Sequence, residues 1–178
     1  PMVNSKGEDT SIIFGFTKYL LDLIHREQPT HIAVSFDPPG GTFRNRLFPD
    51  YKANRSATPQ LVIDALEPLT RIVRSLDIPV LMVPDFEADD VIGTVAKRFA
   101  SAMDVYMVTP DKDYGQLISS HIFQYKPGKG GADNEILGES QVCEKYGISS
   151  PSQVIDMLAI CGDSADNVPG VQGVGPVG

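Results

Sequence analysis

The chain is poor in the features that mark secreted and membrane proteins. It has two cysteines among its 178 residues, Cys143 and Cys161, and their spacing fits no metal-binding motif. Two such cysteines are expected to be free thiols in a reducing compartment. No apolar run approaches the roughly 18 residues that a membrane span needs, and no signal-peptide pattern is present. The sequence therefore predicts a cytoplasmic protein with no membrane partner.

Positive charge is also scarce. Fifteen Lys and Arg residues stand against 23 Asp and Glu residues, and the formal net charge is −8. This balance at first argues against a nucleic-acid partner, because proteins that bind phosphate backbones are usually basic. If eight of the 23 acids were metal ligands, however, the remaining acids would equal the 15 basic residues in number. The positions of the acids therefore decide whether nucleic-acid binding is excluded.

Helical and strand-like patterns of apolar residues alternate along the chain. Strands are expected at 31–36, 79–83, 105–108 and 121–125, and helices at 12–24, 61–76, 88–100, 114–118, 139–146 and 152–160. Such alternation is typical of an α/β fold with a mostly parallel central sheet flanked by helices. No linker divides the chain, so we expect a single domain over residues 1–178.

Acidic residues directly follow three of the predicted strands. Because the carboxyl ends of parallel strands share one edge of the sheet, these carboxylates are expected to meet there. They are Asp37 after the first strand, Glu87, Asp89 and Asp90 after the second, and Asp111 and Asp113 after the third. Asp163 and Asp166 follow an apolar helix, and we expect them to close the same site from the side.

Carboxylates gathered this closely repel one another, and divalent cations would remove the repulsion. A ligand set of carboxylates and water, without His or Cys, suits Mg²⁺ or Mn²⁺. Eight acids suit two ions about 3.5–4 Å apart, an arrangement that stabilises the attacking and leaving oxygens in phosphodiester hydrolysis. The pattern therefore predicts a two-metal hydrolase.

A single acid of this set could have a simpler role than metal binding. Asp85 or Asp111 alone could cap the helix that follows it. Caps do not account for three acids within residues 87–90. A calcium loop starting at Asp111 fails, because its twelfth position is Ile122 rather than Glu. A phosphatase with an aspartate nucleophile needs Asp-x-Asp after the first strand, whereas Pro38 follows Asp37.

Six short segments, in order, carry a family resemblance. They are Ser35-Phe-Asp37, Thr42-Phe-Arg44, Tyr51-Lys-Ala-Asn-Arg55, Phe86-Glu-Ala-Asp-Asp-Val-Ile92, Thr109-Pro-Asp-Lys-Asp113 and Gly162-Asp-Ser-Ala-Asp-Asn-Val-Pro-Gly170. Together they strongly resemble the 5′-nuclease (5′-3′ exonuclease) domain of bacterial DNA polymerase I, in the flap endonuclease superfamily. The resemblance implies a PIN-like core over 1–160, a helical arch region at 38–58, and the start of a helix–three-turn–helix motif at 161–178.

The resemblance also implies roles for single residues. Asp37, Glu87, Asp89 and Asp90 would hold a first metal ion, and Asp111, Asp113, Asp163 and Asp166 a second, some of them through water. Lys52, Arg55, Asp37 and Asp111 would be catalytic, and Arg44, Lys52 and Arg55 would grip the 5′ strand. A basic stretch interleaved with aromatic residues independently suits a single strand with exposed bases, although a solvated loop with Tyr51 in the core would show the same pattern.

The glycines near the end of the chain have two interpretations. Gly170, Gly173 and Gly175 would let backbone N–H groups approach a DNA phosphate. A plain turn would use glycines too, but the adjacent Asp163 and Asp166 favour DNA contact. In the family that the chain resembles, this loop can also bind a monovalent cation such as K⁺.

The function implied is hydrolysis of DNA phosphodiesters at 5′ ends and flaps during replication and repair, in the bacterial cytoplasm at the nucleoid. The expected partners are DNA with a 5′ flap, nick or 5′ end, RNA primer–DNA, and polymerase domains of the same parent chain. The alternative is a structure-specific DNA-binding module without catalysis. The family begins with a strand that carries another metal-binding Asp, and its DNA-binding motif has a second helix. Neither lies between Pro1 and Gly178, so the chain is expected to be a fragment.

Overall fold

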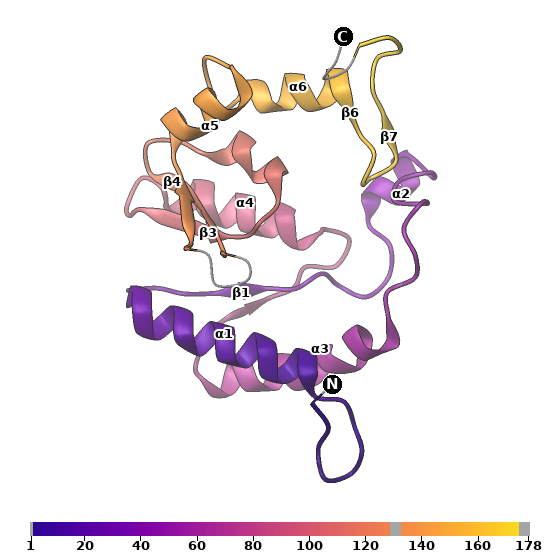
Figure 1. Ribbon diagram of the computed structural model, residues 1–178, viewed down its shortest axis with the longest axis vertical. Coiled ribbons are helices and arrows are strands. Elements are labelled where there is room, and N and C mark those ends of the chain that lie inside the picture. The colour runs from indigo at the N-terminus through magenta and orange to yellow at the C-terminus, as the bar shows by residue number, and fades with distance from the viewer. Residues whose placement is uncertain (1, 129–132, 175–178) are drawn as a thin grey trace. The chain divides into compact units, whose positions relative to one another are not determined.

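The computed structural model describes residues 2–128 and 133–174 (Figure 1). The chain divides into two compact units, one of Pro1–Asp37 with Ser56–Met82 and one of Pro38–Arg55 with Val83–Gly178. All predicted site residues except Asp37 belong to the second unit. Over the described residues, we find no helix with the length and apolar character needed to cross a membrane. The expectation of one domain over the whole chain stays a prediction.

The first unit packs two helices against a pair of parallel strands. Its elements are α1 (Ser11–Glu27), β1 (Val34–Ser35), α3 (Gln60–Ser75) and β2 (Val80–Leu81). Leu20, Val73 and Ile78 form its buried core, which matches the apolar faces expected of both helices. The two strands are shorter than predicted. Pro38, Pro79 and Pro84 flank them, and proline has no N–H to extend a ladder.

The second unit is built around a three-stranded sheet. Strands β3 (Val105–Val108) and β4 (Ile122–Lys126) pair in parallel, and β5 (Glu135–Leu137) pairs with β4 in antiparallel orientation. Helices α4 (Ala88–Phe99), α5 (Glu139–Tyr146) and α6 (Gln153–Cys161) and the 3₁₀ helix η1 (Lys112–Leu117) complete this core. The predicted helices and strands here are confirmed, whereas β5 is too short for the sequence to reveal.

The expected sheet arrangement needs one correction. Within the described residues the strands form separate small sheets, of two, three and two strands, rather than one continuous ladder. The third sheet is a hairpin of β6 (Gly162–Asp163) and β7 (Val168–Pro169), which the sequence pattern did not predict.

That hairpin depends on two glycines. A Cβ on Gly162, where φ is +75°, would lie 2.3 Å from the Gly170 nitrogen, and a Cβ on Gly170 would lie 2.4 Å from the Cys161 carbonyl group. Both distances are too short for any other residue type, so close backbone approach fixes these positions as glycine. In the region 38–58, expected to be a helical arch, the structure has one short helix, α2 (Phe43–Leu47), followed by turns.

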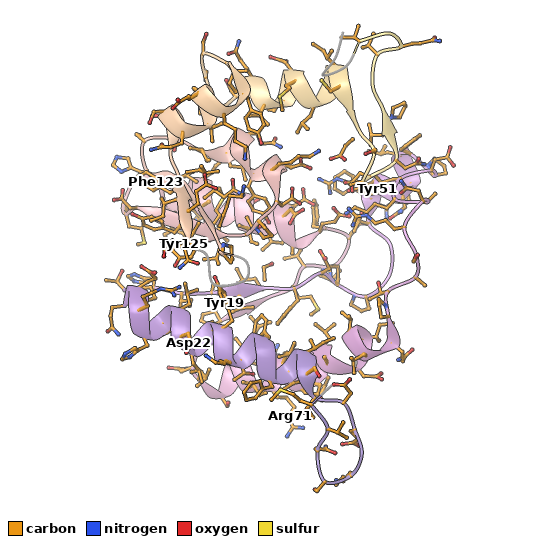
Figure 2. All side chains as sticks on the ribbon, in the orientation of Figure 1. Tyr19, Asp22, Tyr51, Arg71, Phe123 and Tyr125 are labelled. Atoms are coloured by element: carbon orange, nitrogen blue, oxygen red, sulfur yellow. The ribbon has the colours of Figure 1, made fainter. Side chains whose placement is uncertain are left out.

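The two faces of β4 have different surroundings. Ile122 and Gln124 lie on the same face of β4 and are buried, as is Met107, the partner of Gln124 on β3. Phe123 and Tyr125, labelled in Figure 2, alternate with them along the strand. The Phe123 ring stacks on Tyr106 with 5.1 Å between ring centroids. A polar residue therefore stands at a core position in the middle strand of this sheet.

Candidate metal and nucleic-acid site

Residues 50–55 and 163–167 are hydrogen-bonded to each other, and we call this pair of segments the clasp. The Lys52 N–H donates to the Asp166 carbonyl over 2.9 Å, and the Asn54 amide donates to the Ser164 carbonyl over 2.7 Å. In the reverse direction, the Asn167 amide donates to the Asp50 carbonyl over 2.8 Å. Lys52 and Asn167 both have positive φ, 57° and 59°. The clasp thus brings together a basic motif and an acidic motif that lie far apart in the sequence.

A second group of acids lies at the amino end of α4. Glu87 is the N-cap residue, and Asp89 and Asp90 stand in the first helical turn, where the helix dipole favours negative charge. Asp90 accepts the Glu87 N–H over 3.0 Å. The Arg44 guanidinium donates two hydrogen bonds of 2.7 Å to Asp90 and holds the pKa of that carboxyl below its usual range.

One predicted alternative at this helix is wrong. Asp85 does not cap α4, because it has a positive φ of 72° and lies before the N-cap residue. Its carboxylate instead accepts two hydrogen bonds from Arg46, of 2.6 and 2.7 Å, on the surface of the unit. Asp89 has a different partner, since the buried Tyr114 donates its phenol proton to Asp89 over 2.6 Å.

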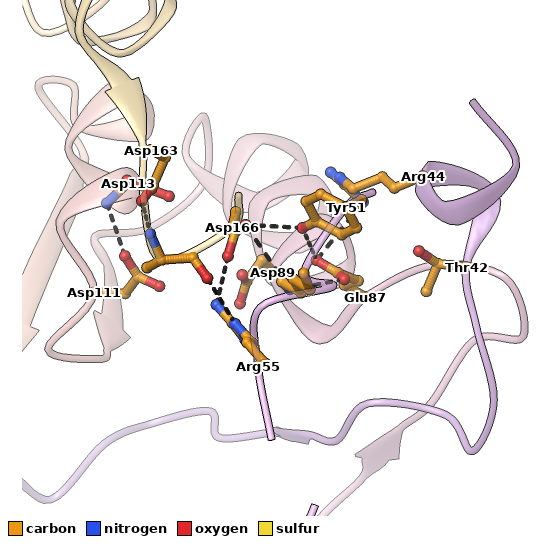
Figure 3. Close-up of polar contacts among 12 residues, drawn as sticks. Thr42, Arg44, Tyr51, Arg55, Glu87, Asp89, Asp111, Asp113, Asp163 and Asp166 are labelled. Carbon is orange, nitrogen blue, oxygen red and sulfur yellow. Dashed lines mark hydrogen bonds and ion pairs between the residues drawn. The ribbon is translucent and has the colours of Figure 1, made fainter. Parts of the chain in front are cut away.

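Tyr51 joins the two acidic groups (Figure 3). Its ring is buried, and its hydroxyl oxygen lies 3.0 Å from Glu87 Oε2 and 2.9 Å from Asp166 Oδ2. A phenol has one proton and can donate to only one carboxylate at a time. Burial and these carboxylates raise the pKa of Tyr51. Tyr51 is buried, as the alternative of a loop with Tyr51 in the core required, but the sequence did not indicate that its hydroxyl links two predicted metal ligands.

The basic side chains of the clasp also contact these carboxylates. Lys52 Nζ lies 2.8 Å from Glu87 Oε1 and 4.0 Å from Asp166 Oδ2, and Arg55 donates a hydrogen bond to Asp166. Arg44 Nη1 lies 3.9 Å from Glu87 as well. Each predicted DNA-binding cation is therefore paired with at least one predicted metal ligand in this structure.

Asp111, Asp113 and Asp163 form the third acidic group. Asp111 Oδ1 accepts the Asp113 N–H over 3.0 Å and so caps η1, which confirms the capping role considered for this residue. One oxygen of Asp111 is enough for that bond. Lys112 Nζ lies 3.2 Å from Asp163 Oδ2 and 4.0 Å from Asp113 Oδ1.

Asp113 is the most perturbed carboxyl of this group. Burial, together with the charges of Asp111 and Asp163, raises the pKa of Asp113 to about 6. Among the described residues, its buried Oδ1 has no hydrogen-bond partner. A buried, unsatisfied carboxylate oxygen is destabilising, and a cation close to it would relieve both the repulsion and the missing contact.

A cleft of about 340 Å³ opens among these groups. It is lined by Arg44, Tyr51, Glu87, Asp89, Asp90, Gly93, Thr94, Lys97, Asp113, Tyr114, Gln116, Leu117 and Asp166. Acidic and basic side chains share its walls, so it offers oxygen ligands for a cation beside donors for a phosphate.

The donor set fits hard divalent cations, because it consists of carboxylate oxygens without thiolate or imidazole. Asp113, whose buried Oδ1 has no hydrogen-bond partner among the described residues, supports that fit. Across residues 2–128 and 133–174, however, no three acidic, histidine or cysteine side chains have the geometry of a finished metal site. The carboxylates of Glu87, Asp90 and Asp166 form ion pairs with Lys52, Arg44 and Arg55, in that order. These ion pairs would have to break before the carboxylates could bind a metal ion.

The structure describes all eight predicted metal ligands and two of the three glycines predicted to bind DNA. Seven of the eight predicted ligands lie in the second unit; Asp37 is the exposed last residue of a segment of the first unit, and its part in the site stays a prediction. Gly170 serves the hairpin, and Gly173 lies in a turn with a φ of +81°. Gly175 lies outside the described residues. The roles predicted for these glycines in DNA binding stay predictions.

The fold is that of PIN-like nucleases. The bacteriophage T5 flap endonuclease, solved with DNA and metal ions, matches 97% of this chain and 65% of its own, with a TM-score of 0.78 and 20% identity. The catalytic core of Rad2, solved with a DNA substrate, matches 99% of this chain and 53% of its own, with a TM-score of 0.57 and 17% identity. At these identities the likeness concerns the fold.

Sequence comparison gives the family. Residues 1–147 match the family described as 5′-3′ exonuclease, N-terminal resolvase-like domain, and the chain belongs to that family. It is 37% identical to the 5′-3′ exonuclease of Aquifex aeolicus over 177 residues, which cover 99% of this chain and 60% of that protein. It is 38% identical to DNA polymerase I of Bacillus caldotenax over 173 residues, which cover 97% of this chain and 20% of the polymerase.

The chain thus spans about three fifths of the exonuclease relative and about one fifth of the polymerase relative. The family resemblance carried by the six motifs is confirmed by these matches. The activity, substrates and partners of the whole protein are taken up below as proposals.

Proposed function

We propose that this chain is the catalytic part of a metal-dependent 5′-3′ exonuclease and flap endonuclease that hydrolyses DNA phosphodiesters at 5′ ends and flaps. The observation that carries the proposal is the clasp. It places Lys52 and Arg55 beside Glu87 and Asp166, so groups suited to a phosphate and groups suited to a metal share one cleft. Membership of the 5′-3′ exonuclease family supports the same activity.

The acids would hold two divalent ions, Mg²⁺ or Mn²⁺. Glu87, Asp89 and Asp90, with Asp37, would serve the first ion, and Asp111, Asp113, Asp163 and Asp166 the second. When bound, such ions lower the charge barrier at the attacking and leaving oxygens of a phosphodiester. The raised pKa of Asp113, about 6, and its buried Oδ1, which has no hydrogen-bond partner among the described residues, support the second set, because both favour binding of a cation.

The basic residues would bind the substrate. Arg44, Lys52 and Arg55 carry donors that suit phosphate oxygens, and all three contact carboxylates of the proposed first or second metal set. Cations arriving at the acids would free these side chains for the phosphate. Lys52 and Arg55 would then neutralise charge that develops on the phosphate, while Asp37 and Asp111 act through the metal ions that they hold.

The substrate would be DNA with a 5′ flap, nick or 5′ end, including RNA primer–DNA, in the bacterial cytoplasm at the nucleoid. Gly170, Gly173 and Gly175 would bring backbone N–H groups to a DNA phosphate, and their loop could take K⁺. Polymerase domains in the same parent chain would be a further partner, as the match to DNA polymerase I of Bacillus caldotenax supports.

The test is Asp111→Asn in the full-length protein that carries this chain, assayed on 5′-flap DNA with Mg²⁺ or EDTA. Asn caps a helix about as well as Asp, so the η1 turn should survive while one charged metal ligand is lost. Cleavage should disappear and flap binding should remain. Asp156→Asn is the matched control, because Asp156 is an exposed acid on α6 of the same unit.

Turnover by Asp111→Asn at the wild-type rate would overturn the assignment of this residue. Flap binding by the wild-type protein that is independent of Mg²⁺ and leads to no cleavage would instead favour the non-catalytic DNA-binding module.

A further inference from the structure

Gln124 stands where the fold calls for an apolar side chain. It lies at the centre of β4, pairs with Met107 of β3 and Leu137 of β5, and is 1% exposed. Met107 and Leu137 are both part of the buried core of the second unit. Burying an amide among apolar side chains is unfavourable unless its donors and acceptors find partners. The position of Gln124 therefore calls for a reason in the contacts that it makes.

Those contacts are to one turn. The Gln124 side-chain nitrogen donates a hydrogen bond of 3.1 Å to the carbonyl of Thr109 and another to the carbonyl of Asp111. Both acceptors are carbonyl oxygens, so the amide must present its NH₂ group to the turn. Pro110 lies between the two acceptors and has no N–H of its own. One buried side chain thus holds the carbonyl groups of the two residues on either side of the proline.

The turn held by Gln124 sets the positions of two predicted metal ligands. Thr109 continues the strand ladder through its N–H to the Tyr125 carbonyl, over 3.0 Å, and its hydroxyl accepts the Asp111 N–H over 3.1 Å. Asp111 in turn accepts the Asp113 N–H over 3.0 Å. The chain of bonds runs from the core of the sheet to Asp113, whose Oδ1 is buried without a hydrogen-bond partner among the described residues.

We infer that Gln124 is a positioning residue for the metal site, which fixes the turn at Thr109–Asp111 so that Asp111 and Asp113 present their carboxylates to one cation. The inference rests on the proposed function, because it assumes that these two acids bind a metal ion. Gln124 touches neither the metal nor the substrate, and it acts through the backbone. An apolar residue at 124 would suit the core and release the turn.

The experiment compares wild-type protein with Gln124→Met, in the full-length chain. Methionine has nearly the same shape as glutamine and packs well in a core, but it cannot donate a hydrogen bond. Mn²⁺ binding, followed by electron paramagnetic resonance or calorimetry, should weaken by about tenfold or more, the usual effect of removing a group that orients a metal ligand. In the metal-free protein, hydrogen exchange at the Asp113 amide should speed up.

Cleavage gives a third readout. The metal concentration needed for half-maximal rate should rise for Gln124→Met, and the rate at saturating metal should recover most of its wild-type value. Val142→Ala is the control, because Val142 is fully buried in the same core but does not contact the turn through hydrogen bonds. It should lower stability without changing Mn²⁺ affinity or exchange at Asp113.

The outcomes separate the two ideas. If wild-type protein binds Mn²⁺ and cleaves DNA, and Gln124→Met matches it in Mn²⁺ affinity and in exchange at Asp113, the positioning role is wrong while the proposed function stands. Equal weakening of Mn²⁺ binding in Val142→Ala would also contradict a specific role. Wild-type protein that neither binds Mn²⁺ nor cleaves DNA would overturn both.

Discussion

Arg44 and Asp90, 46 positions apart in the sequence, are joined by two parallel hydrogen bonds of 2.7 Å each. This bidentate pair fixes the short helix α2 to the first turn of α4. The side chains of Arg44 and Asp90 are 31% and 25% exposed. The pair is therefore partly shielded from water, which lets it contribute to stability. It is also partly exposed, which leaves room for either side chain to bind another partner.

Arg44→Met should lower the free energy of unfolding at pH 7 by about 1–2 kcal/mol, since a charge-assisted pair at this exposure is lost. The Asp90 pKa is lowered in the folded state, mainly by the Arg44 hydrogen bonds. Its contribution is therefore present above the unfolded pKa, near 4, and is lost as pH falls through the folded value. Urea unfolding between pH 7 and pH 2 should show the difference between wild type and variant shrinking in acid.

Arg46→Met is the matched control for Arg44→Met. Arg46 makes the same bidentate contact with Asp85, but 67% of its side chain is exposed, so solvent should screen the pair. The free energy of unfolding should therefore fall less in Arg46→Met than in Arg44→Met. Equal losses in the two variants would show that burial of the Arg44 pair is unimportant.

Asp113→Asn should stabilise the metal-free protein increasingly as pH rises from about 4, with the full effect above about pH 6. The folded-state pKa of Asp113 is raised to about 6 by burial and by Asp111 and Asp163. The folded protein therefore holds this proton more tightly than the unfolded chain does, and stability falls as pH rises from about 4 to 6. Asparagine should remove about 1–2 kcal/mol of that penalty at pH 8, after allowance for the part of the side chain that is exposed.

Metal binding should depend on the same proton in the opposite sense. A cation must displace the Asp113 proton, so Mn²⁺ affinity should fall as pH drops below about 6, with proton release on binding. Unfolding curves in EDTA at pH 4.5 and 8, and calorimetric Mn²⁺ titrations in two buffers at pH 5.5, measure the two effects. A stability gain from Asp113→Asn that is the same at both pH values would contradict the assignment.

Lys52→Met should separate metal binding from catalysis. Lys52 Nζ lies 2.8 Å from Glu87 Oε1, so this ammonium group competes with any cation for that carboxylate. Removing it should raise Mn²⁺ affinity by a few-fold and reduce the cleavage rate by about a hundredfold or more, since a donor to the phosphate is lost. Metal titrations and single-turnover cleavage of flap DNA measure these opposite changes.

Lys97→Met controls for the loss of a positive charge in general, because Lys97 lines the same cleft from α4. It should change Mn²⁺ affinity less than Lys52→Met does. Weaker Mn²⁺ binding in Lys52→Met than in the wild type would refute the competition between Lys52 and a metal ion.

Local pattern accounts for what the sequence could predict. Helices α1, α3 and α4 follow from apolar residues at helical spacing, and β3 from four apolar or aromatic residues in a row. The four acidic groups could be found because each follows a strand or a helix of this kind. The Asp111 cap could be anticipated from its position before η1.

Pairing over long sequence distances accounts for what the sequence could not predict. Nothing near Tyr51 indicates that its hydroxyl meets Glu87 and Asp166, and nothing near Gln124 indicates that it holds the turn at Thr109. The hairpin of β6 and β7 has only two residues in each strand, too few for a periodic signal. The pairing of Lys52 with an acid also depends on tertiary structure, because the sequence shows only its charge.

The clasp has a consequence for the order of folding. Its hydrogen bonds join residues 50–55 to residues 163–167, a separation of 110 or more positions. Contacts that close so long a loop carry a large entropic cost, and they form after local helices and neighbouring strands. During synthesis, Lys52 and Arg55 can therefore contact Asp166 only after Asp166 has left the ribosome. The sheet core of the second unit should accordingly be folded before its basic and acidic motifs meet.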